Sequence, residues 1–317
     1  MITGQMLDKG RIHNVKAEEI KRKNVVWLDF SGPSKNEIKQ VSEITGMSEP
    51  EIVELLQPQT RPLLTNIDKY SVIILQSPLH DGDDVTKPVL VFISKKSNDL
   101  ITMHMHEMGS IKRMLAWEER RKVRIFEKGT TYILYSLIDE IAASYSSIMN
   151  NIDDNIEKLE AGIYEPSNEE KHMMQHAFEV KKRLIYFYKA LTANREVVSA
   201  IEKEYGMFLD RKDLSKFRLL HSDFTQLVEL TVTYRDILTT TIEVYLSVVS
   251  NNLNITVKKL TAWGAIILLP SIVSGIYGMN FKYLPEAEWR YGYLFALAIM
   301  LAMVLVSYIY FKRKEWL

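Results

Sequence analysis

The chain has 317 residues, of which 47% are apolar, so it is long enough for two folded domains. Its 40 basic and 40 acidic residues cancel, which argues against a protein that binds nucleic acid. There is no cysteine, and this excludes disulfides and thiolate metal sites. Residues 1–23 are polar and lack the apolar core of a secretion signal, so we expect the bulk of the chain to be cytoplasmic.

Residues 1–128 are predicted to form a mixed α/β domain. Runs of β-branched and aromatic residues alternate there with helical periodicity and with turns such as Ser31-Gly32-Pro33. The polar segment 80–86 is predicted to connect two strands as a hairpin. The expected elements, in chain order, are a strand at 25–30, helices at 36–44 and 49–56, and strands at 70–76, 88–93 and 100–106.

A helical hairpin is predicted for residues 129–206. Its first helix is expected at 130–162, where no proline occurs and the one glycine is the last residue. Ser167 with Glu170 forms a capping box for the second helix, which we expect to end near Gly206.

A stalk helix is predicted for residues 207–259, which contain neither glycine nor proline. Large side chains recur there at intervals of three and four residues, a heptad stripe that favours helices packed side by side. The stripe comprises Phe217, Leu220, Phe224, Leu227, Thr231, Tyr234, Leu238, Thr241, Tyr245 and Val248. Two helices with a break near Asn251 and Asn252 are the alternative to one continuous helix.

Two apolar runs, at 260–277 and 291–310, are each about long enough to cross a hydrocarbon core of ~30 Å. Residues 260–317 therefore fit two transmembrane helices joined by a short loop at 281–290. Lys258 and Lys259 precede the first run, and a basic segment at 312–314 follows the second. Because cytoplasmic flanks of membrane spans are rich in Lys and Arg, both termini are predicted to be cytoplasmic and the loop external.

Two helices cannot enclose an aqueous path, so a conducting protein of this design must be an oligomer. Small, polar or narrow residues recur every seven positions in the first run, a spacing that keeps one face on a symmetry axis. They form two rows, Asn254, Thr261, Leu268 and Gly275 beside Val257, Gly264, Ser271 and Gly278. The alternative is that the small residues merely allow close helix packing.

The segment Tyr277-Gly278-Met279-Asn280-Phe281 follows the first run directly. Together with Leu284-Pro285-Glu286 and the C-terminal segment 310–317, it resembles the CorA family of magnesium transport proteins. The resemblance implies an α+β fold: a cytoplasmic α/β domain, a long helical stalk and two C-terminal transmembrane helices, assembled as a homopentameric funnel in the cell membrane.

The resemblance also implies roles for individual residues. Gly278, Met279 and Asn280 would form the selectivity filter, with Glu286 as an acidic residue of the external loop. Hydrophobic constriction would rest mainly on Leu260 and Leu268. The implied pore-lining residues are Asn254, Val257, Leu260, Gly264, Leu268, Ser271 and Gly275.

Asn280 suits a hydrated magnesium ion. No acidic residue occurs between Leu260 and Asn280. Mg²⁺ gives up its waters reluctantly, and a ring of amide carbonyls can accept hydrogen bonds from those waters without stripping them. Gly278 would permit a backbone turn where the helix ends. For Asn280 alone, a helix C-cap is the alternative.

Cytoplasmic carboxylates that bind Mg²⁺ and close the pore are a further implication of the resemblance. Glu54 and Asp139 match two of the acidic positions, whereas the third is occupied by Leu219; Asp223, one helical turn later, could take its place. The alternative is that all three acids are ordinary solvated or salt-bridged carboxylates.

Two histidine pairs, His172 with His176 and His104 with His106, have spacings that suit a metal. Two ligands, however, fall short of the usual zinc set. No phosphate-binding glycine loop or nucleophile arrangement is present, so the sequence does not predict an enzyme.

The function predicted from the sequence is uptake of hydrated Mg²⁺ driven by the membrane potential and gated by cytoplasmic Mg²⁺. The expected partners are further copies of the chain, the lipid bilayer and divalent cations. One alternative is a Zn²⁺, Co²⁺ or Ni²⁺ transporter, or a Mg²⁺ exporter, on the same scaffold. The other is a non-conducting membrane-anchored sensor.

Overall fold

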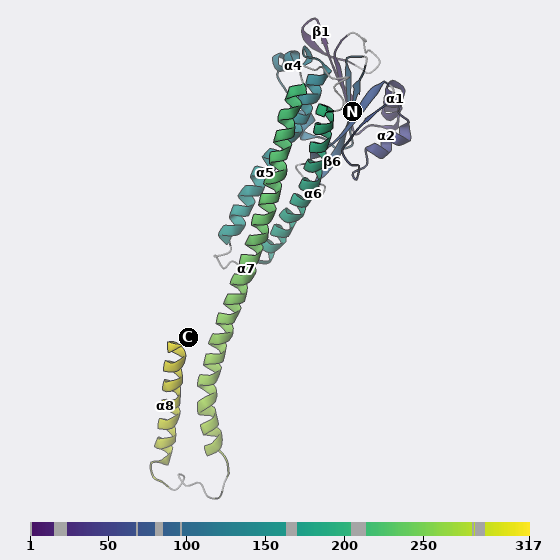
Figure 1. The fold of residues 1–317 in the computed structure, drawn as a ribbon. Coiled ribbons are helices and arrows are strands. Elements are labelled where there is room, and N and C mark those ends of the chain that lie inside the picture. The colour runs from purple at the N-terminus through teal and green to yellow at the C-terminus, as the bar shows by residue number, and fades with distance from the viewer. Residues whose placement is uncertain are drawn as a thin grey trace. The chain divides into compact units, whose positions relative to one another are not determined.

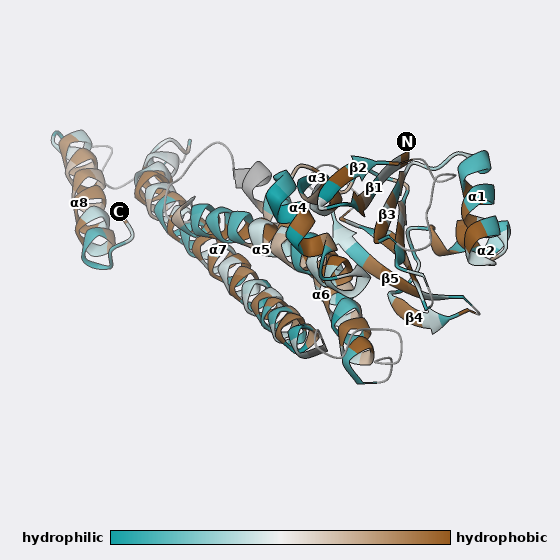
Figure 2. Ribbon diagram, turned by 90° about the horizontal axis from the view of Figure 1, so that it is seen from above, coloured by the Kyte–Doolittle hydropathy of each residue, from teal (hydrophilic) through white to brown (hydrophobic). Residues whose placement is uncertain are grey.

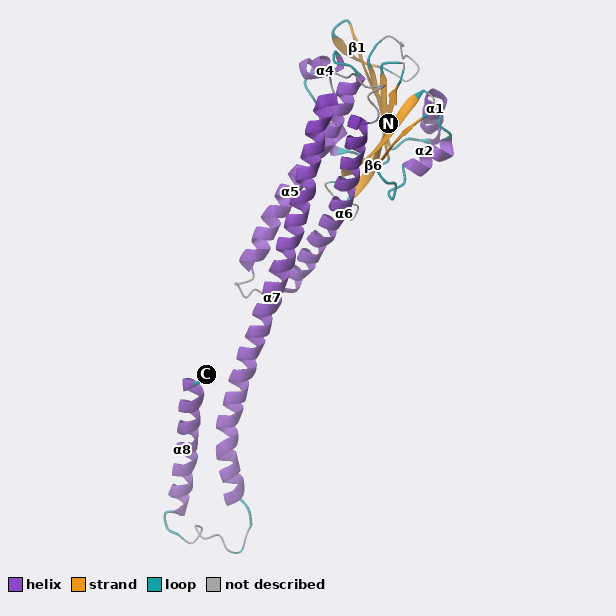
Figure 3. Cartoon of the chain, in the orientation of Figure 1, coloured by secondary structure: helices purple, strands orange, loops and turns teal. Residues whose placement is uncertain are grey.

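The structure is a computed structural model that describes residues 2–15, 24–67, 69–79, 85–95, 97–162, 170–203, 214–280, 282 and 289–317. It divides into two compact units, residues 1–241 and 242–317. Strands occur in the first unit, and the second is helical (Figure 3).

A seven-stranded sheet in the order β2-β1-β3-β7-β6-β5-β4 lies at the centre of the first unit. The pair β3–β7 is parallel, and the other neighbouring pairs are antiparallel. The strands are β1 (Ile2–Asp8), β2 (Arg11–Asn14), β3 (Val26–Ser31), β4 (Leu63–Asn66), β5 (Tyr70–Pro78), β6 (Thr86–Ser94) and β7 (Asp99–His104).

The sheet is covered on both faces. Helices α1 (Lys35–Thr45) and α2 (Glu49–Leu55) lie on one side, and α5 (Thr130–Gly162) and α6 (Glu170–Lys203) lie on the other (Figure 1). Every residue of β5 and β7 is buried, as expected for strands with both faces covered. Alternate residues point to opposite faces, and Phe30, Ile74 and Phe92 share one core with Ile52 of α2.

The expected strands and helices of this region are present. Ser34 and Ser48 cap α1 and α2 through capping boxes with Glu37 and Glu51. Strand β1, the edge strands β2 and β4, and two short helices, α3 (Gly109–Leu115) and α4 (Glu119–Phe126), were not predicted from the sequence. The antiparallel β5–β6 pair agrees with the predicted hairpin, whose residues 80–84 lie outside the described residues, as does the predicted Ser167 cap.

Helix α7 (Leu214–Tyr277) is continuous through Asn251, Asn252 and Pro270, so the alternative of a break is wrong. Its stripe is buried from Phe217 to Thr241 and only half-buried at Tyr245 and Val248.

Neighbours of the same chain cover this part of α7. The rings of Phe217 and Tyr135 of α5 meet edge to face at 6.2 Å between centroids. Arg218 Nε lies 3.0 Å from a Glu202 carboxylate oxygen of α6, and the Thr241 hydroxyl donates to Glu160 Oε1 of α5 at 3.2 Å. The heptad stripe therefore packs within one chain.

Candidate ion-conducting site

The second unit contains the end of α7 and the helix α8 (Gly292–Arg313). Both helices are long and apolar enough to cross a membrane, with mean hydropathies of 1.7 and 2.4 over their most apolar windows. Only 11% and 6% of these windows is buried, so they are not core helices of a soluble fold. Apolar residues predominate along α8 (Figure 2).

One face of α7 is shielded in this unit. Ala262 and Ile266 are buried, and Val273 and Tyr277, which lie on the same side of the helix, are half-buried. On α8 the buried residues are the small ones Gly292, Ala296 and Ser307, which allow a close approach of helices.

The predicted pore-lining residues lie on the opposite side of α7, because successive residues turn by about 100° around a helix. Asn254 lies at the border of this face. All seven are exposed within one chain, Leu260 at 74% and Leu268 at 60%. They are Asn254, Val257, Leu260, Gly264, Leu268, Ser271 and Gly275.

The predicted pore face of α7 is open, and the hydroxyl of Ser271 on this face is already hydrogen-bonded within the helix. A Cβ added to Gly264 or Gly275 would meet no heavy atom within 4 Å, so these glycines do not serve helix packing within the described part of one chain. The Ser271 hydroxyl donates to the Ile267 carbonyl at 2.8 Å, which leaves its oxygen free to accept from water.

Sequence reasoning missed two residues of the same face. Leu246 and Leu253 precede Leu260 by fourteen and seven residues and are also exposed. Their heptad spacing was the available signal, and they extend the face toward the N-terminal end of the helix.

The helix ends at the Gly-Met-Asn segment. The amides of Gly278 and Met279 still donate to the carbonyls of Ser274 and Ile276 at 2.9 and 3.2 Å. The turn expected at Gly278 is present directly after the helix and needs no positive φ there; a Cβ at this position would lie 3.1 Å from the Ser274 carbonyl oxygen.

Asn280 is exposed at the end of this segment. It does not adopt the left-handed conformation of an asparagine cap, and its side chain makes no hydrogen bond with any described residue. The C-cap alternative is therefore wrong. Glu286 lies outside the described residues.

Asp139 and Asp223, on α5 and α7, lie close enough to interact. Burial raises the pKa of Asp139, the Glu140 and Asp223 carboxylates raise it further, and Arg121 partly offsets these effects. Burial also raises the pKa of Asp223. A cation between the two carboxylates would relieve their repulsion.

Glu54 does not join this pair within one chain, since α2 and α5 cover opposite faces of the sheet (Figure 1). Leu219 is 62% exposed on α7. Among the described residues, no three His, Asp or Glu side chains are grouped closely enough to hold a metal ion.

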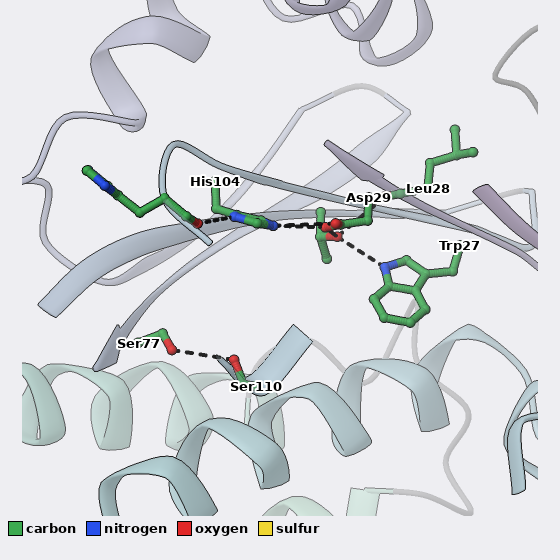
Figure 4. A network of polar contacts seen from close by, with 8 residues as sticks. Trp27, Leu28, Asp29, Ser77, His104 and Ser110 are labelled. Carbon is green, nitrogen blue, oxygen red and sulfur yellow. Dashed lines mark hydrogen bonds and ion pairs between the residues drawn. The ribbon is translucent and has the colours of Figure 1, made fainter. Parts of the chain in front are cut away.

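The zinc interpretation of His104 with His106 is wrong, because both ring nitrogens of His104 are occupied (Figure 4). Nδ1 contacts the His106 carbonyl, and Nε2 lies 3.2 Å from Asp29 Oδ1. The Thr102 hydroxyl donates to the same carboxylate at 2.5 Å and accepts from Trp27 Nε1 at 3.1 Å. In the other pair, the His172 side chain lies outside the described residues, and His176 is 4.0 Å from Glu179.

These features define an integral membrane protein with a large polar unit, two C-terminal spans, and an exposed helix face that ends in an uncharged asparagine. Comparison with known proteins agrees. Residues 22–313 match the family described as CorA-like Mg²⁺ transporter protein. The cobalt/magnesium transport protein CorA of Methanocaldococcus jannaschii is 31% identical over 97% of both chains. The chain therefore belongs to the CorA-like Mg²⁺ transporter family.

Solved structures support the same assignment. The complete structure of the CorA magnesium transporter from M. jannaschii superposes with a TM-score of 0.87 at 29% identity, covering 100% of this chain and 99% of that one. The soluble domain of the same protein superposes with a TM-score of 0.69 at 27% identity, covering 78% of this chain and 97% of that one. The predicted fold, an α/β domain, a long helix and two C-terminal apolar helices, is confirmed.

Proposed function

We propose that copies of this chain, five as the family resemblance implies, assemble around the exposed face of α7 and conduct hydrated Mg²⁺ into the cytoplasm. Membership of a Mg²⁺ transporter family makes Mg²⁺ the transported substrate. The observation that carries the proposed pore is the open face from Leu246 to Gly275, which has no covering segment among the described residues of its own chain.

The proposed filter is a ring of Asn280 side chains, with Gly278 and Met279 shaping the mouth. Each free amide carbonyl would accept hydrogen bonds from the waters that Mg²⁺ retains. A carboxylate ring would hold the ion more tightly and slow its release. Since Gly278 is constrained by the Ser274 carbonyl, a larger residue there would displace Asn280 from its position at the end of the helix.

The proposed constriction lies deeper in the span. Leu260 and Leu268 present branched apolar side chains to the axis, and such rings gate by excluding water. Gly264, Ser271 and Gly275 alternate with them and leave room for the hydration shell. Opening would then require only that the leucine rings move apart.

Electrostatics favours uptake. With both termini cytoplasmic, an inside-negative potential drives a divalent cation inward by roughly 4.6 kcal/mol per 100 mV, twice the value per elementary charge. The membrane potential alone would therefore drive accumulation of Mg²⁺ in the cytoplasm, without a counter-ion being transported.

The proposed regulation places cytoplasmic Mg²⁺ between subunits. Asp139 and Asp223 would bind the ion from one chain and Glu54 from another, because Glu54 does not lie beside the other two within a single chain. Leu219 supplies no carboxylate, so inhibition by internal Mg²⁺ should be weak. Leu219→Asp should lower the internal Mg²⁺ concentration that halves the flux by about tenfold, the effect of one added cation–carboxylate interaction of ~1.4 kcal/mol.

The direct test is flux. Purified protein in liposomes with an imposed inside-negative potential should take up Mg²⁺, read by an entrapped fluorescent indicator. Faster uptake of Zn²⁺, Co²⁺ or Ni²⁺ than of Mg²⁺ would favour the alternative cation transporter. Transport only outward would indicate an exporter, and absence of flux for all four ions would indicate a non-conducting sensor.

A further inference from the structure

A polar cavity in the first unit lies far along the chain from the filter and is not explained by ion conduction. Its volume is about 370 Å³, within the range of small-molecule sites. Residues of α5 and α6, together with Val85 directly before β6, line it: Val85, Ile152, Asn155, His176, Glu179, Val180, Lys182 and Arg183.

Cationic and amide groups line the cavity without partners. Three polar groups make no hydrogen bond or ion pair with the described residues: the half-buried Arg183 guanidinium, the Lys182 ammonium and the Asn155 amide. A half-buried guanidinium with five donors is costly to leave unpaired, and it fits phosphate oxygens in a bidentate manner.

Among the described residues that line the cavity, the one carboxylate is already engaged. Glu179 accepts from Gln175 Nε2 at 3.4 Å and lies 4.0 Å from His176 Nδ1. A single acid among two permanent cations does not make a cation site, because Mg²⁺ and its relatives require several oxygen ligands. The charge of the lining therefore selects an anion.

The remaining lining is apolar. Ile152 and Val180 are almost fully buried beside Val85, which is half-buried. Inorganic phosphate would leave the apolar surface of Val85 in water, whereas an organic group attached to a phosphate would cover it.

We propose that this cavity binds a small organic phosphate, with Arg183 and Lys182 holding the phosphate and Val85 contacting the organic part. The site joins α5 to α6, so its ligand would bridge the two helices that support the first part of α7. The inference does not depend on the pore, and its test is run without Mg²⁺.

The test is calorimetric titration of the full-length protein in detergent, with EDTA and about 50 mM salt to limit screening. The probes are ADP, pyrophosphate, phosphate and uncharged adenosine. We expect ADP to bind more tightly than pyrophosphate, pyrophosphate more tightly than phosphate, and adenosine not at all. Arg183→Gln should weaken ADP binding about tenfold or more, and Lys182→Gln somewhat less.

Lys189→Gln is the matched control, because Lys189 is an exposed lysine of the same helix outside the cavity. It should titrate like the wild type, and Arg183→Lys should retain part of the affinity. Unchanged melting of each variant without ligand shows that folding is intact. The proposal is overturned if ADP gives no heat at millimolar concentration, if Arg183→Gln binds ADP as the wild type does, or if adenosine binds as tightly as ADP.

Discussion

The two halves of α7 belong to one uninterrupted helix but lie in opposite environments. Up to Thr241 the large side chains of its heptad stripe are buried, with contacts to α5 of the same chain at Phe217 and Thr241. Beyond Thr241 most of the large apolar side chains are exposed, as Leu253 and Leu260 show. Burial of each large side chain contributes roughly 1.5–3 kcal/mol, so the first half is stabilised by its own chain. The second half requires lipid and other subunits for the same gain.

In the pore that we propose, this difference separates folding from conduction. Residues that fill the first half determine the stability of the first unit, whereas residues of the exposed face would determine what passes along the proposed axis. Substitutions in the two halves should therefore produce different defects, and each prediction below tests one side of this division.

The largest effect on stability is expected for Phe217→Ala. Phe217 is fully buried beside Tyr135, so its truncation should cost about 3–5 kcal/mol in the free energy of unfolding. Leu260→Ala, at an exposed position, should change unfolding by less than about 0.5 kcal/mol while altering flux. Urea unfolding of the full-length protein in detergent, followed by circular dichroism, measures both. Equal losses of stability in the two variants would contradict the proposed difference between the two halves of α7.

The continuity of α7 could be predicted because residues 207–263 contain no glycine or proline, and the inner strands because their β-branched runs are buried on both faces. The edge strands β2 and β4 could not be predicted, since short strands that are half-buried or exposed carry weak patterns, and β1 was missed as well. A heptad stripe also does not reveal whose helix it packs against.

The site was predictable to a similar degree. The face of α7 follows from seven-residue spacing, but the pairing of Asp139 with Asp223 depends on how α5 and α7 pack. The sequence already disfavoured zinc at His104, but it could not show the contact with Asp29, which lies 75 residues away along the chain.

A pH-dependent effect is expected for Asp139→Asn in metal-free buffer. An acid whose pKa is raised in the folded state contributes most stability below its ordinary pKa, and this contribution is lost as pH rises through the folded-state value. At pH 7 the charged Asp139 is therefore unfavourable, and the variant should be more stable by roughly 1 kcal/mol, a figure discounted for partial exposure.

This advantage should shrink as the pH is lowered toward 4, and thermal melts at several pH values measure it. The exposed Asp236, paired with its neighbour Arg235, provides the control Asp236→Asn, which should show no such trend. If the difference in stability between Asp139→Asn and the wild type instead grew as the pH is lowered, the raised pKa assigned to Asp139 would be contradicted.

The smallest effect is expected for Thr241→Val at the boundary between the two halves. The substitution keeps the packed methyl group but removes the hydroxyl that donates to Glu160, at a cost of about 0.5–1.5 kcal/mol. The loss should appear in the unfolding of the first unit and leave the subunit assembly, measured by light scattering, unchanged. Dissociation of the oligomer would instead show that Thr241 lies between subunits.

The most direct test of the account compares potential-driven Mg²⁺ uptake into liposomes for the wild type, Asn280→Ala and Asn252→Ala. Asn252 is an exposed asparagine of α7 that lies away from the predicted pore face. We predict that Asn280→Ala lowers the initial rate at least about tenfold, equivalent to ~1.4 kcal/mol on the barrier, with an unchanged oligomer. Asn252→Ala should transport like the wild type. An Asn280→Ala variant with the wild-type rate and cation selectivity would contradict the assignment of the filter.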